Sequence, residues 1–454
     1  MPKLERLLRS CSVSSASNLT TRRLIGLKHR SHYKSCIQEL SKHGIKPSKK
    51  MPGGHVICCH IDKRRMKQLQ SLTEHPSVKY VEPDFKISAH GLGVARSAPK
   101  RITTHVPSTR RMGLPAATST TRVSQKSKPL LKGNIYKPSA ACPAGVTWNV
   151  CRVQAPDVWS DTRGNGVGIG IIDTGIAKHP DLRISGGVNT IDGSSFLDDN
   201  GHGTHVAGVA AARGTNNQIP GVAPKAKLYA VKALDANGEG YVSDIIKGID
   251  WCIAKKIPVI NMSIGLQGAS SEALREAIQR ARSNGIVIVA SAGNSGPNSG
   301  GIDEPASYPE TIAVAASTKA NKIASYSSRG KGIIITAPGD NIRSTWLHNG
   351  YTTLSGTSMA SPHVAGGAAL LLAHEPTLKP SQVSSRLRST AKELSGSSNL
   401  SQGSGLIQVD RAINKKSSTN RTRVSSVCKC RKTGRPLTNS CICKTGKSAN
   451  RKNK

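Results

Sequence analysis

Aromatic side chains are scarce in this chain and make up only 3% of its 454 residues. Proteins that bind single-stranded nucleic acid without sequence preference stack bases on aromatic rings, so the scarcity argues against that mode of binding. Long apolar runs are also missing, because the longest ones have the size of a strand. The sequence therefore predicts no membrane-spanning helix.

The first residues, Met1 to Ser10, lack the apolar stretch of a secretory signal. They contain Ser and Arg and few acids, a composition that has a faint likeness to an organelle transit peptide. We therefore expect residues 1–32 to be a disordered or targeting segment. Eleven cysteines, an odd number, do not settle the redox compartment. An atypical export route, an organelle and packaging with nucleic acid in a virion all remain open.

Acidic side chains are nearly absent outside the middle of the chain. Residues 154–413 hold 23 basic and 20 acidic side chains, whereas the flanks hold 42 basic and 6 acidic ones. Nearly all of the formal net charge of +39 therefore lies in the flanks. We expect a nearly neutral globular core with cationic arms, which favour a polyanionic partner such as nucleic acid or an acidic glycan.

Composition and pattern divide the chain into five segments: 1–32, 33–90, 91–150, 151–414 and 415–454. The second alternates helix-like and strand-like stretches and predicts a small α+β module. The third has no acidic residue and predicts a basic flexible linker. The fifth is a basic tail with two C-x-C pairs.

The cysteines of that tail are Cys428, Cys430, Cys441 and Cys443. They could form a small disulfide knot, bind zinc or remain free thiols. Zinc sites favour a C-x₂₋₄-C spacing, from which C-x-C departs.

The middle segment alternates between apolar, β-branched runs and helix-like stretches. The strand-like runs are Val167–Ile172, Leu228–Leu234, Val259–Ile264, Ile286–Ala290, Ile312–Ala316 and Ile333–Thr336. The helix-like stretches are Val206–Arg213, Ser243–Lys255, Ser271–Asn284, Ser361–His374 and Pro380–Glu393. This alternation predicts a three-layer α/β fold, a mainly parallel sheet with helices on both faces. Functional side chains are then expected where strands end and helices begin.

Ser358 lies where a Gly- and Ser-rich turn enters a helix, and Pro362 is expected in the first turn. A hydroxyl there faces free backbone donors and the positive end of the helix dipole. That position suits a nucleophilic oxygen that must develop negative charge. An N-cap serine on a buried helix has the same local sequence, so the motif alone does not decide.

Three further motifs occupy strand ends or helix starts. Asp173 ends an apolar strand in a D-T-G triplet, and the chain lacks the second such triplet that an aspartic protease needs. His202 and His205 stand three apart at a helix start, where metal ligation is an alternative to acid–base chemistry. Asn294 follows a strand between glycines and is suited to donate to an oxyanion, or else to form an ordinary turn.

Taken together, Asp173-Thr-Gly, His202-Gly-Thr-His, Ala292-Gly-Asn294 and Gly356-Thr-Ser358 resemble the motifs of the subtilisin-like serine proteases, peptidase family S8. The motifs occur in that order on a matching α/β pattern from about Val153 to Ala412. The resemblance implies that Asp173, His202 and Ser358 form a catalytic triad. It further implies that Asn294 is the oxyanion donor and that His205 is structural.

The resemblance implies a monomeric serine endopeptidase that is made as a zymogen, acts on polypeptides and needs no cofactor for catalysis. Family members are commonly extracellular. A competing interpretation is a catalytically dead protease fold that binds polyanions through its arms, against which the intact triad argues.

Substrate contacts are also implied by the resemblance. An extended substrate is expected between Gly238 and Gly240 on one side and Ser263, Ile264 and Gly265 on the other. Asp303 falls where family members line the S1 pocket, and an acid there favours a basic P1 residue. A solvated loop carboxylate is the alternative.

Asp181 matches a calcium ligand of several family members. The companion loop, residues 215–221, is about two residues shorter than theirs. Residues 33–90 are similar to an inhibitory propeptide of the I9 type, with Val78–Asp84 resembling its end. Autocleavage is expected close to His90-Gly91, although the linker is some fifty residues longer than in typical members, which leaves a second cut within 91–141 open.

Overall fold

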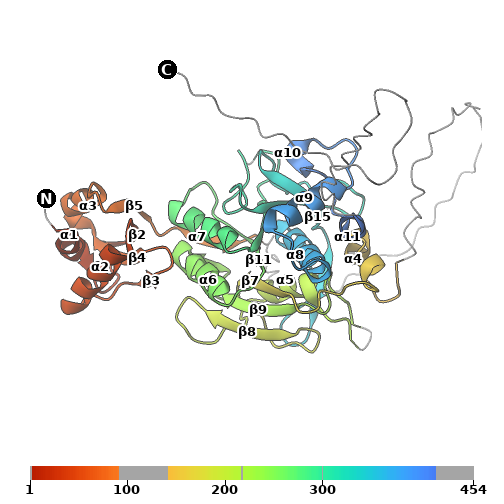
Figure 1. The fold of residues 1–454 in the computed structure, drawn as a ribbon, viewed down its shortest axis with the longest axis horizontal. Helices are drawn as coiled ribbons and strands as arrows, with labels where there is room; N and C mark the ends of the chain where they lie inside the picture. The colour runs from red at the N-terminus through yellow and green to blue at the C-terminus, as the bar shows by residue number, and fades with distance from the viewer. Residues whose placement is uncertain (1–2, 91–141, 216–217, 299, 416–454) are drawn as a thin grey trace, which may run out of the picture. The chain divides into compact units, whose positions relative to one another are not determined.

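The computed structural model describes residues 3–90, 142–215, 218–298 and 300–415 (Figure 1). Contacts divide the chain into two units, Met1–Lys415 and Lys416–Lys454. The second unit lies outside the described residues, as does most of the predicted linker. The predictions for the tail cysteines and for cleavage within the linker therefore concern residues that the structure does not describe. Among the described residues, none of the helices combines the length and apolarity needed to cross a membrane.

A seven-stranded parallel sheet forms the middle layer of the larger domain, residues 142–415. Its strand order is β15-β14-β13-β11-β7-β9-β8. The strands are β7 (Gly168–Asp173), β8 (Ile184–Asn189), β9 (Lys227–Lys232), β11 (Val259–Met262), β13 (Val287–Ser291), β14 (Ile312–Ser317) and β15 (Ile333–Pro338). The order reverses direction around β7 and β11, which places their carboxyl ends at the switch point where α/β proteins hold functional groups.

Helices cover both faces of this sheet, which confirms the predicted three-layer fold. Helices α5 (His202–Ala211) and α8 (Thr357–His374) pack in the core on one face, and α6 (Val242–Ala254) and α7 (Glu272–Ser283) pack on the other. Neighbouring residues of β7 point to opposite cores, since Ile171 belongs to the first and Ile172 to the second. Both are fully buried, as expected for a strand covered on two sides.

Smaller elements complete the domain. They are α4 (Trp148–Arg152), β10 (Glu239–Tyr241), β12 (Ile264–Gly265), β16 (Ile342–Thr345), β17 (Tyr351–Leu354), α9 (Pro380–Thr390), α10 (Asn399–Gln402) and α11 (Val409–Asn414). The six predicted strands and five predicted helices all have a counterpart. Strand β8 was not predicted, because its Ser-Gly-Gly centre hides the apolar pattern.

Helix α8 begins at Thr357, four residues earlier than predicted, so Pro362 lies inside the helix rather than in its first turn. A proline there cannot donate to the carbonyl four residues before it, which belongs to Ser358. The hydroxyl of Ser263 donates to that carbonyl instead, at 2.8 Å. The carbonyl that Pro362 leaves without a helix donor thus accepts a side-chain hydrogen bond, which links α8 to the residue after β11.

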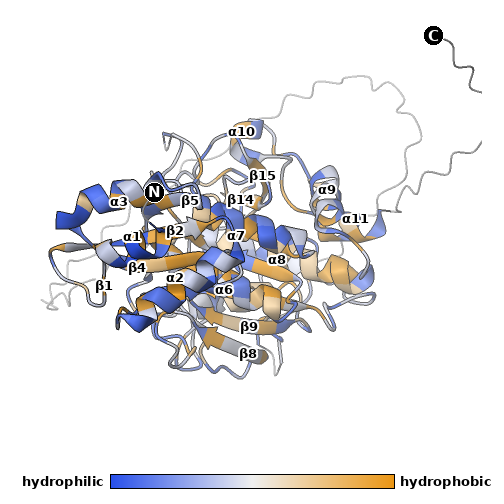
Figure 2. Ribbon diagram, turned by 60° about the vertical axis from the view of Figure 1, so that its left-hand side comes forward, coloured by the Kyte–Doolittle hydropathy of each residue, from blue (hydrophilic) through white to orange (hydrophobic). Residues whose placement is uncertain are grey.

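Residues 3–89 form a small module of antiparallel strands and helices. Its elements are α1 (Leu4–Cys11), β1 (Ser12–Val13), β2 (Thr20–Leu27), α2 (Arg30–Lys42), β3 (Lys49–Met51), β4 (Val56–Asp62), α3 (Met66–Thr73), β5 (Val78–Pro83) and β6 (Lys86–Ala89). Leu24, Met51 and Val56 of the module share a hydrophobic core with the larger domain, and its last strand, β6, pairs with β10 and β12 of that domain. Strands β1, β4, β2 and β5 are neighbours in that order. Figure 2 shows a contrast within the module: β4 is coloured hydrophobic, whereas much of α3 is coloured hydrophilic.

Residues 3–32 are ordered in the structure, so the prediction of a disordered segment is wrong there, and a targeting role stays a prediction. Leu4, Leu7, Leu8 and Cys11 are buried at the spacing of one helix face, and β2 pairs with both β4 and β5. Abundant basic residues on the opposite face of α1 obscured this amphipathic pattern. The module therefore starts near Leu4 instead of at residue 33.

The domain boundary at residue 151 also needs correction. A disulfide joins Cys142 to Cys151. The side chain of Asn149 lies 2.9 Å from Nε2 of His363 in α8. The nine residues before 151 are thus tied to the larger domain and do not belong to the linker.

We expect truncation of Leu8 to destabilise the module. Leu8 is fully buried, so Leu8→Ala should cost about 2–5 kcal/mol through lost transfer energy and a cavity. The loss of stability is measured by hydrogen exchange in the full chain, where the β2 amides of the variant should exchange faster. Leu19→Ala is the matched control, because Leu19 is 51% exposed and its truncation should change stability by less than about 0.5 kcal/mol. Equal protection in both variants would show that α1 does not contribute to the module core.

Candidate active site

Asp173 and His202 meet at the carboxyl edge of the sheet. Asp173 is the last residue of β7 and His202 is the first residue of α5. The imidazole Nδ1 lies 2.7 Å from Oδ1 of the carboxylate, and both side chains are buried. A Cβ at Gly203 would lie 2.1 Å from the carbonyl oxygen of Gly175, so only glycine lets the helix start approach the aspartate turn this closely.

The loop before α5 is held by its own polar side chains. Asp198 accepts hydrogen bonds from the backbone of Gly201 and from the backbone and hydroxyl of Thr204. Asn200 accepts from the backbone N–H of His202 at 3.0 Å. These contacts satisfy free donors at the helix start and fix the position of the imidazole.

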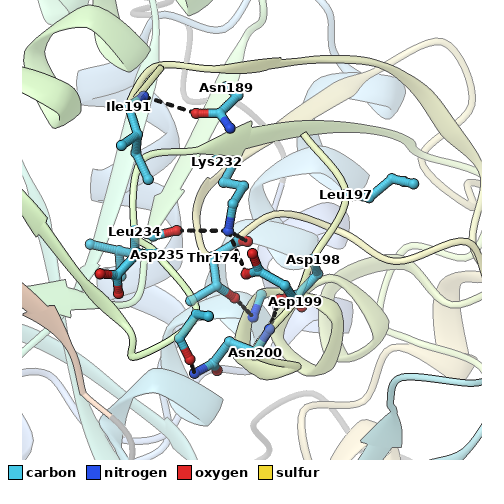
Figure 3. Close-up of polar contacts among 12 residues, drawn as sticks. Thr174, Asn189, Ile191, Leu197, Asp198, Asp199, Asn200, Lys232, Leu234 and Asp235 are labelled. Atoms are coloured by element: carbon cyan, nitrogen blue, oxygen red, sulfur yellow. Dashed lines mark hydrogen bonds and ion pairs between the residues drawn. The ribbon is translucent and has the colours of Figure 1, made fainter. Parts of the chain in front are cut away.

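Lys232, at the end of β9, ties three segments together beneath this loop. Its ammonium donates to the carbonyl oxygens of Thr174 (2.9 Å) and Leu234 (3.1 Å) and to Oδ1 of Asp199 (2.6 Å), as Figure 3 shows. The side chain is nearly fully buried. Sequence reasoning missed this residue; the only available signal was a lysine inside an otherwise apolar strand.

The two histidines of the motif have opposite electrostatic environments. Burial acts to lower the pKa of His202, but the charge and hydrogen bond of Asp173, with a smaller contribution from Asp198, outweigh it and raise the pKa above its usual value. Burial lowers the pKa of His205 to about 3. Its Nε2 lies 2.9 Å from the carbonyl oxygen of Ile342, so His205 is a neutral packing residue.

Ser358 is the second residue of α8 and is fully buried. Its hydroxyl donates to the carbonyl oxygen of Ser263 at 3.0 Å rather than to His202. Within the described residues, Nε2 of His202 is buried and has no hydrogen-bond partner. The structure therefore joins the aspartate and the imidazole, and leaves the serine hydroxyl turned toward β11.

Asn294 follows β13 and holds a fixed orientation. Its Oδ1 accepts from the backbone N–H and from the hydroxyl of Thr357, both at 2.9 Å. These two donors direct the amide nitrogen the other way. Nδ2 donates to the carbonyl oxygen of His90 at 2.6 Å.

The segment that ends at His90 lies in the expected substrate position. Strand β6 pairs antiparallel with β10 on one side and with β12 on the other. The backbone N–H of Ala89 donates to the carbonyl of Gly238, and that of His90 donates to the carbonyl of Ser263. Gly240 and Ile264, predicted to contact substrate, pair with Ile87 and Ala89. Residues 86–90 of the chain itself thus occupy the groove.

Asp303 also contacts the segment that ends at His90. Its Oδ2 lies 2.8 Å from Nε2 of His90. The neighbouring Glu304 points elsewhere and accepts from Ser270, from the backbone of Ser271 and from the hydroxyl of Tyr308. The hydroxyl of Ser291 lies 2.7 Å from Nδ1 of His90. Sequence reasoning identified Asp303 but missed His90 and Ser291 as its neighbours at this position.

Two residues of the companion loop, 216 and 217, lie outside the described residues, so calcium binding at Asp181 stays a prediction. The buried carboxylate of Asp181 accepts from the backbone N–H of Thr215 at 3.2 Å and from the hydroxyl of Tyr351 at 3.3 Å. Calcium takes six to eight oxygen ligands, with several carboxylates among them in typical sites. In the described part of the chain, no three His, Cys, Asp or Glu side chains gather in a way that could hold a metal ion.

An aspartate–histidine pair, a serine at a helix start and an oriented amide donor converge beside a peptide segment bound as an added strand. This arrangement defines the class of serine hydrolases that act on extended polypeptides.

Comparison with known proteins narrows the class. The sequence model of the Subtilase family matches residues 164–405. Subtilisin Savinase from Lederbergia lenta is 45% identical over 269 residues, which cover 59% of this chain and 98% of that protein. Subtilisin DY from Bacillus licheniformis is 48% identical over 254 residues, or 55% and 92% of the two chains. The minor extracellular protease Epr of Bacillus subtilis is 41% identical over 264 residues, or 58% and 41%.

The chain belongs to the subtilase family of serine endopeptidases, and its substrates are polypeptides.

We expect Asp173→Asn to lower the pKa of His202. The substitution removes the charge that raises this pKa and leaves the burial that lowers it. Because the folded pKa is raised, the pair stabilises the fold below the usual histidine pKa, and this stability is lost as pH rises through the folded value. NMR titration of the His202 ring in full-length protein checks the shift. Asp161→Asn, at an exposed site, is the control; an unchanged His202 titration in Asp173→Asn would contradict the coupling.

Proposed function

We propose that Asp173, His202 and Ser358 act as the catalytic triad, with Asn294 and the backbone N–H of Ser358 as the oxyanion hole. The Ser358 hydroxyl first turns from Ser263 toward Nε2 of His202. Nε2 takes the hydroxyl proton while Oγ attacks the scissile carbonyl, and the two donors bind the oxygen that becomes negative. His202 then protonates the leaving amine. Water releases the acyl group by the same steps, so catalysis uses only the chain's own residues.

One observation carries this proposal: the backbone carbonyl of His90 accepts a hydrogen bond from Asn294, the proposed oxyanion donor. Asn294 binds the oxygen of His90, and the N–H of His90 binds the Ser263 carbonyl that also holds the Ser358 hydroxyl. The Ser358 hydroxyl and the His90 N–H therefore share one acceptor, the Ser263 carbonyl, while the His90 carbonyl accepts from Asn294. We infer that the bond between His90 and Gly91 is the first one cleaved and that His90 is the P1 residue.

The N-terminal module supports the role of an inhibitory propeptide that assists folding. Glu82 accepts from the Ser271 hydroxyl and from the backbone of Glu272 at the start of α7. Asp84 accepts from the backbone and hydroxyl of Ser243 at the start of α6. Carboxylates at helix N-termini stabilise helices by about 0.3–1 kcal/mol each, and by up to about 2 kcal/mol when partly buried. The module thus stabilises both helices on this face of the sheet.

A buried ammonium group strengthens the same interface. Lys49 of β3 lies 2.7 Å from Oδ1 of Asp244 and donates to the carbonyl oxygen of Thr190 at 2.6 Å. Both charged side chains are more than nine-tenths buried. A lone buried charge is costly, so each partner depends on the other while the module stays bound.

We expect Ser358→Ala to abolish labelling by a fluorophosphonate serine probe. In subtilisin itself, loss of this serine costs about 10⁶ in turnover, and loss of the oxyanion asparagine costs about 10²–10³. Asn294→Ala should therefore still label at Ser358 but cleave peptides about 10²–10³-fold more slowly. Turnover that survives in Ser358→Ala would refute the assignment of the nucleophile.

We expect Lys49→Met to weaken inhibition by the module. Breaking a buried ion pair costs about 3–5 kcal/mol, which predicts at least about 10²-fold faster release of the processed module. The delay before activity appears in refolded full-length protein measures this release. Lys50→Met removes an exposed lysine from the same strand and should leave the delay unchanged. Identical delays in the two variants would count against the anchoring role.

We further propose a polyanionic partner for the basic linker and tail, on the strength of their charge. Counterion release makes such binding fall steeply with salt. Retention of a 415–454 peptide on immobilised heparin or DNA at increasing salt tests this. Salt-independent retention, or none at low salt, would exclude it.

A further inference from the structure

The side chain of His90 fills a small polar pocket next to the cleavage position. Only 8% of this residue is exposed. Its Nε2 lies 2.8 Å from Oδ2 of Asp303, and its Nδ1 lies 2.7 Å from Oγ of Ser291. Both nitrogens of the ring are therefore engaged by the catalytic domain.

Two glycines leave the space, here called the slot, that the His90 ring and the Asp303 carboxylate occupy. A Cβ at Gly265 would lie 1.7 Å from Nε2 of His90 and 2.1 Å from its Cε1, so the ring rests directly on the backbone there. A Cβ at Gly293, where φ is +109°, would lie 2.6 Å from Oδ2 of Asp303. The missing side chains leave space for a planar ring and for the carboxylate that meets it.

The polar groups stand at the two ends of that slot. Ser291 is fully buried at the end of β13, and Asp303 lies on the loop that follows. A hydroxyl can donate or accept, so Ser291 binds Nδ1 of either the neutral or the protonated imidazole. Asp303 accepts from the N–H at Nε2 in both forms. The spacing of the two partners matches the two nitrogens of one imidazole.

Other side chains fit the pocket less completely. An apolar ring would leave the carboxylate of Asp303 and the hydroxyl of Ser291 buried without partners, which is costly. A lysine ammonium can pair with Asp303 but offers no planar group to the slot, and it leaves Ser291 without its ring partner. The pocket therefore discriminates by hydrogen bonding as well as by charge.

We propose that Ser291 and Asp303 make the S1 pocket selective for histidine at P1. The inference rests on the proposed function, because it takes His90 as the P1 residue. It refines the simpler expectation of a preference for any basic residue. Substrates of this class are polypeptides with an accessible histidine in an extended segment.

The test uses processed enzyme obtained from the full chain and peptides of sequence Lys-Ile-Ser-Ala-X-p-nitroanilide, which copy residues 86–89 before the varied position. X is histidine, lysine, glutamine or phenylalanine. We expect kcat/KM for histidine to exceed that for lysine by about 10-fold and that for phenylalanine by about 10²-fold, as one and two lost polar contacts predict. This series needs no variant, so it does not depend on altered proteins that fold poorly.

Variants then assign the selectivity to residues. Asp303→Asn should lower kcat/KM for the histidine peptide by about 10–10²-fold and change that for phenylalanine by less than about 3-fold. Ser291→Ala should lower the histidine value by about 10-fold and spare lysine. Ser295→Ala removes an exposed hydroxyl four residues along the same segment and should preserve every ratio.

Labelling of Ser358 by a fluorophosphonate distinguishes a failure of the pocket assignment from a failure of the proposed function. Enzyme that labels at Ser358 but cuts phenylalanine or lysine peptides as fast as histidine overturns the pocket assignment and leaves the triad intact. Equal losses for all four peptides in Asp303→Asn also overturn it. Enzyme that neither labels nor cuts any peptide overturns the proposed function and the pocket assignment together.

Discussion

The buried hydrogen bond between Asp173 and His202 is the contact on which the site depends. It joins the end of one strand to the start of a helix, 29 residues apart in the sequence, in a region with little water access. Three features hold the segments around it in place: the missing side chain at Gly203, the helix cap formed by Asp198 and the buried ammonium of Lys232. Each restricts how far the carboxylate and the imidazole can move apart. Preorganisation of this kind is what electrostatic catalysis requires.

The serine is restrained differently, by hydrogen bonds to the residue that follows β11. Pro362 frees the carbonyl of Ser358, and Ser263 binds both that carbonyl and the serine hydroxyl. The carbonyl of Ser263 also receives the N–H of His90. With residues 86–90 in the groove and the hydroxyl turned toward β11, the site holds a peptide without the serine–histidine contact that attack needs. In the proposed function, release of the module frees the Ser263 carbonyl from the His90 N–H and opens the groove to other polypeptides.

Much of this arrangement could be predicted from the sequence, because parallel strands under two helical layers leave long apolar runs. The end of β7 at Asp173 and the asparagine after β13 followed from that pattern. Long-range contacts could not be predicted in this way, because no local feature indicates that Lys49 contacts Asp244 or that His90 contacts Ser291. The amphipathic face of α1 was hidden by basic residues, and the place of Cys142 in the domain depended on its partner. Such features arise from tertiary contacts, which periodicity and spacing do not encode.

The central claim is that the chain's own strand presents the His90–Gly91 bond to Ser358. The most direct measurement follows refolded full-length protein over time by intact mass spectrometry, with N-terminal sequencing of the fragments. The account predicts a first cleavage that yields one fragment ending at His90 and another beginning at Gly91. A first cut elsewhere, with the His90–Gly91 bond intact in mature and active enzyme, would contradict it.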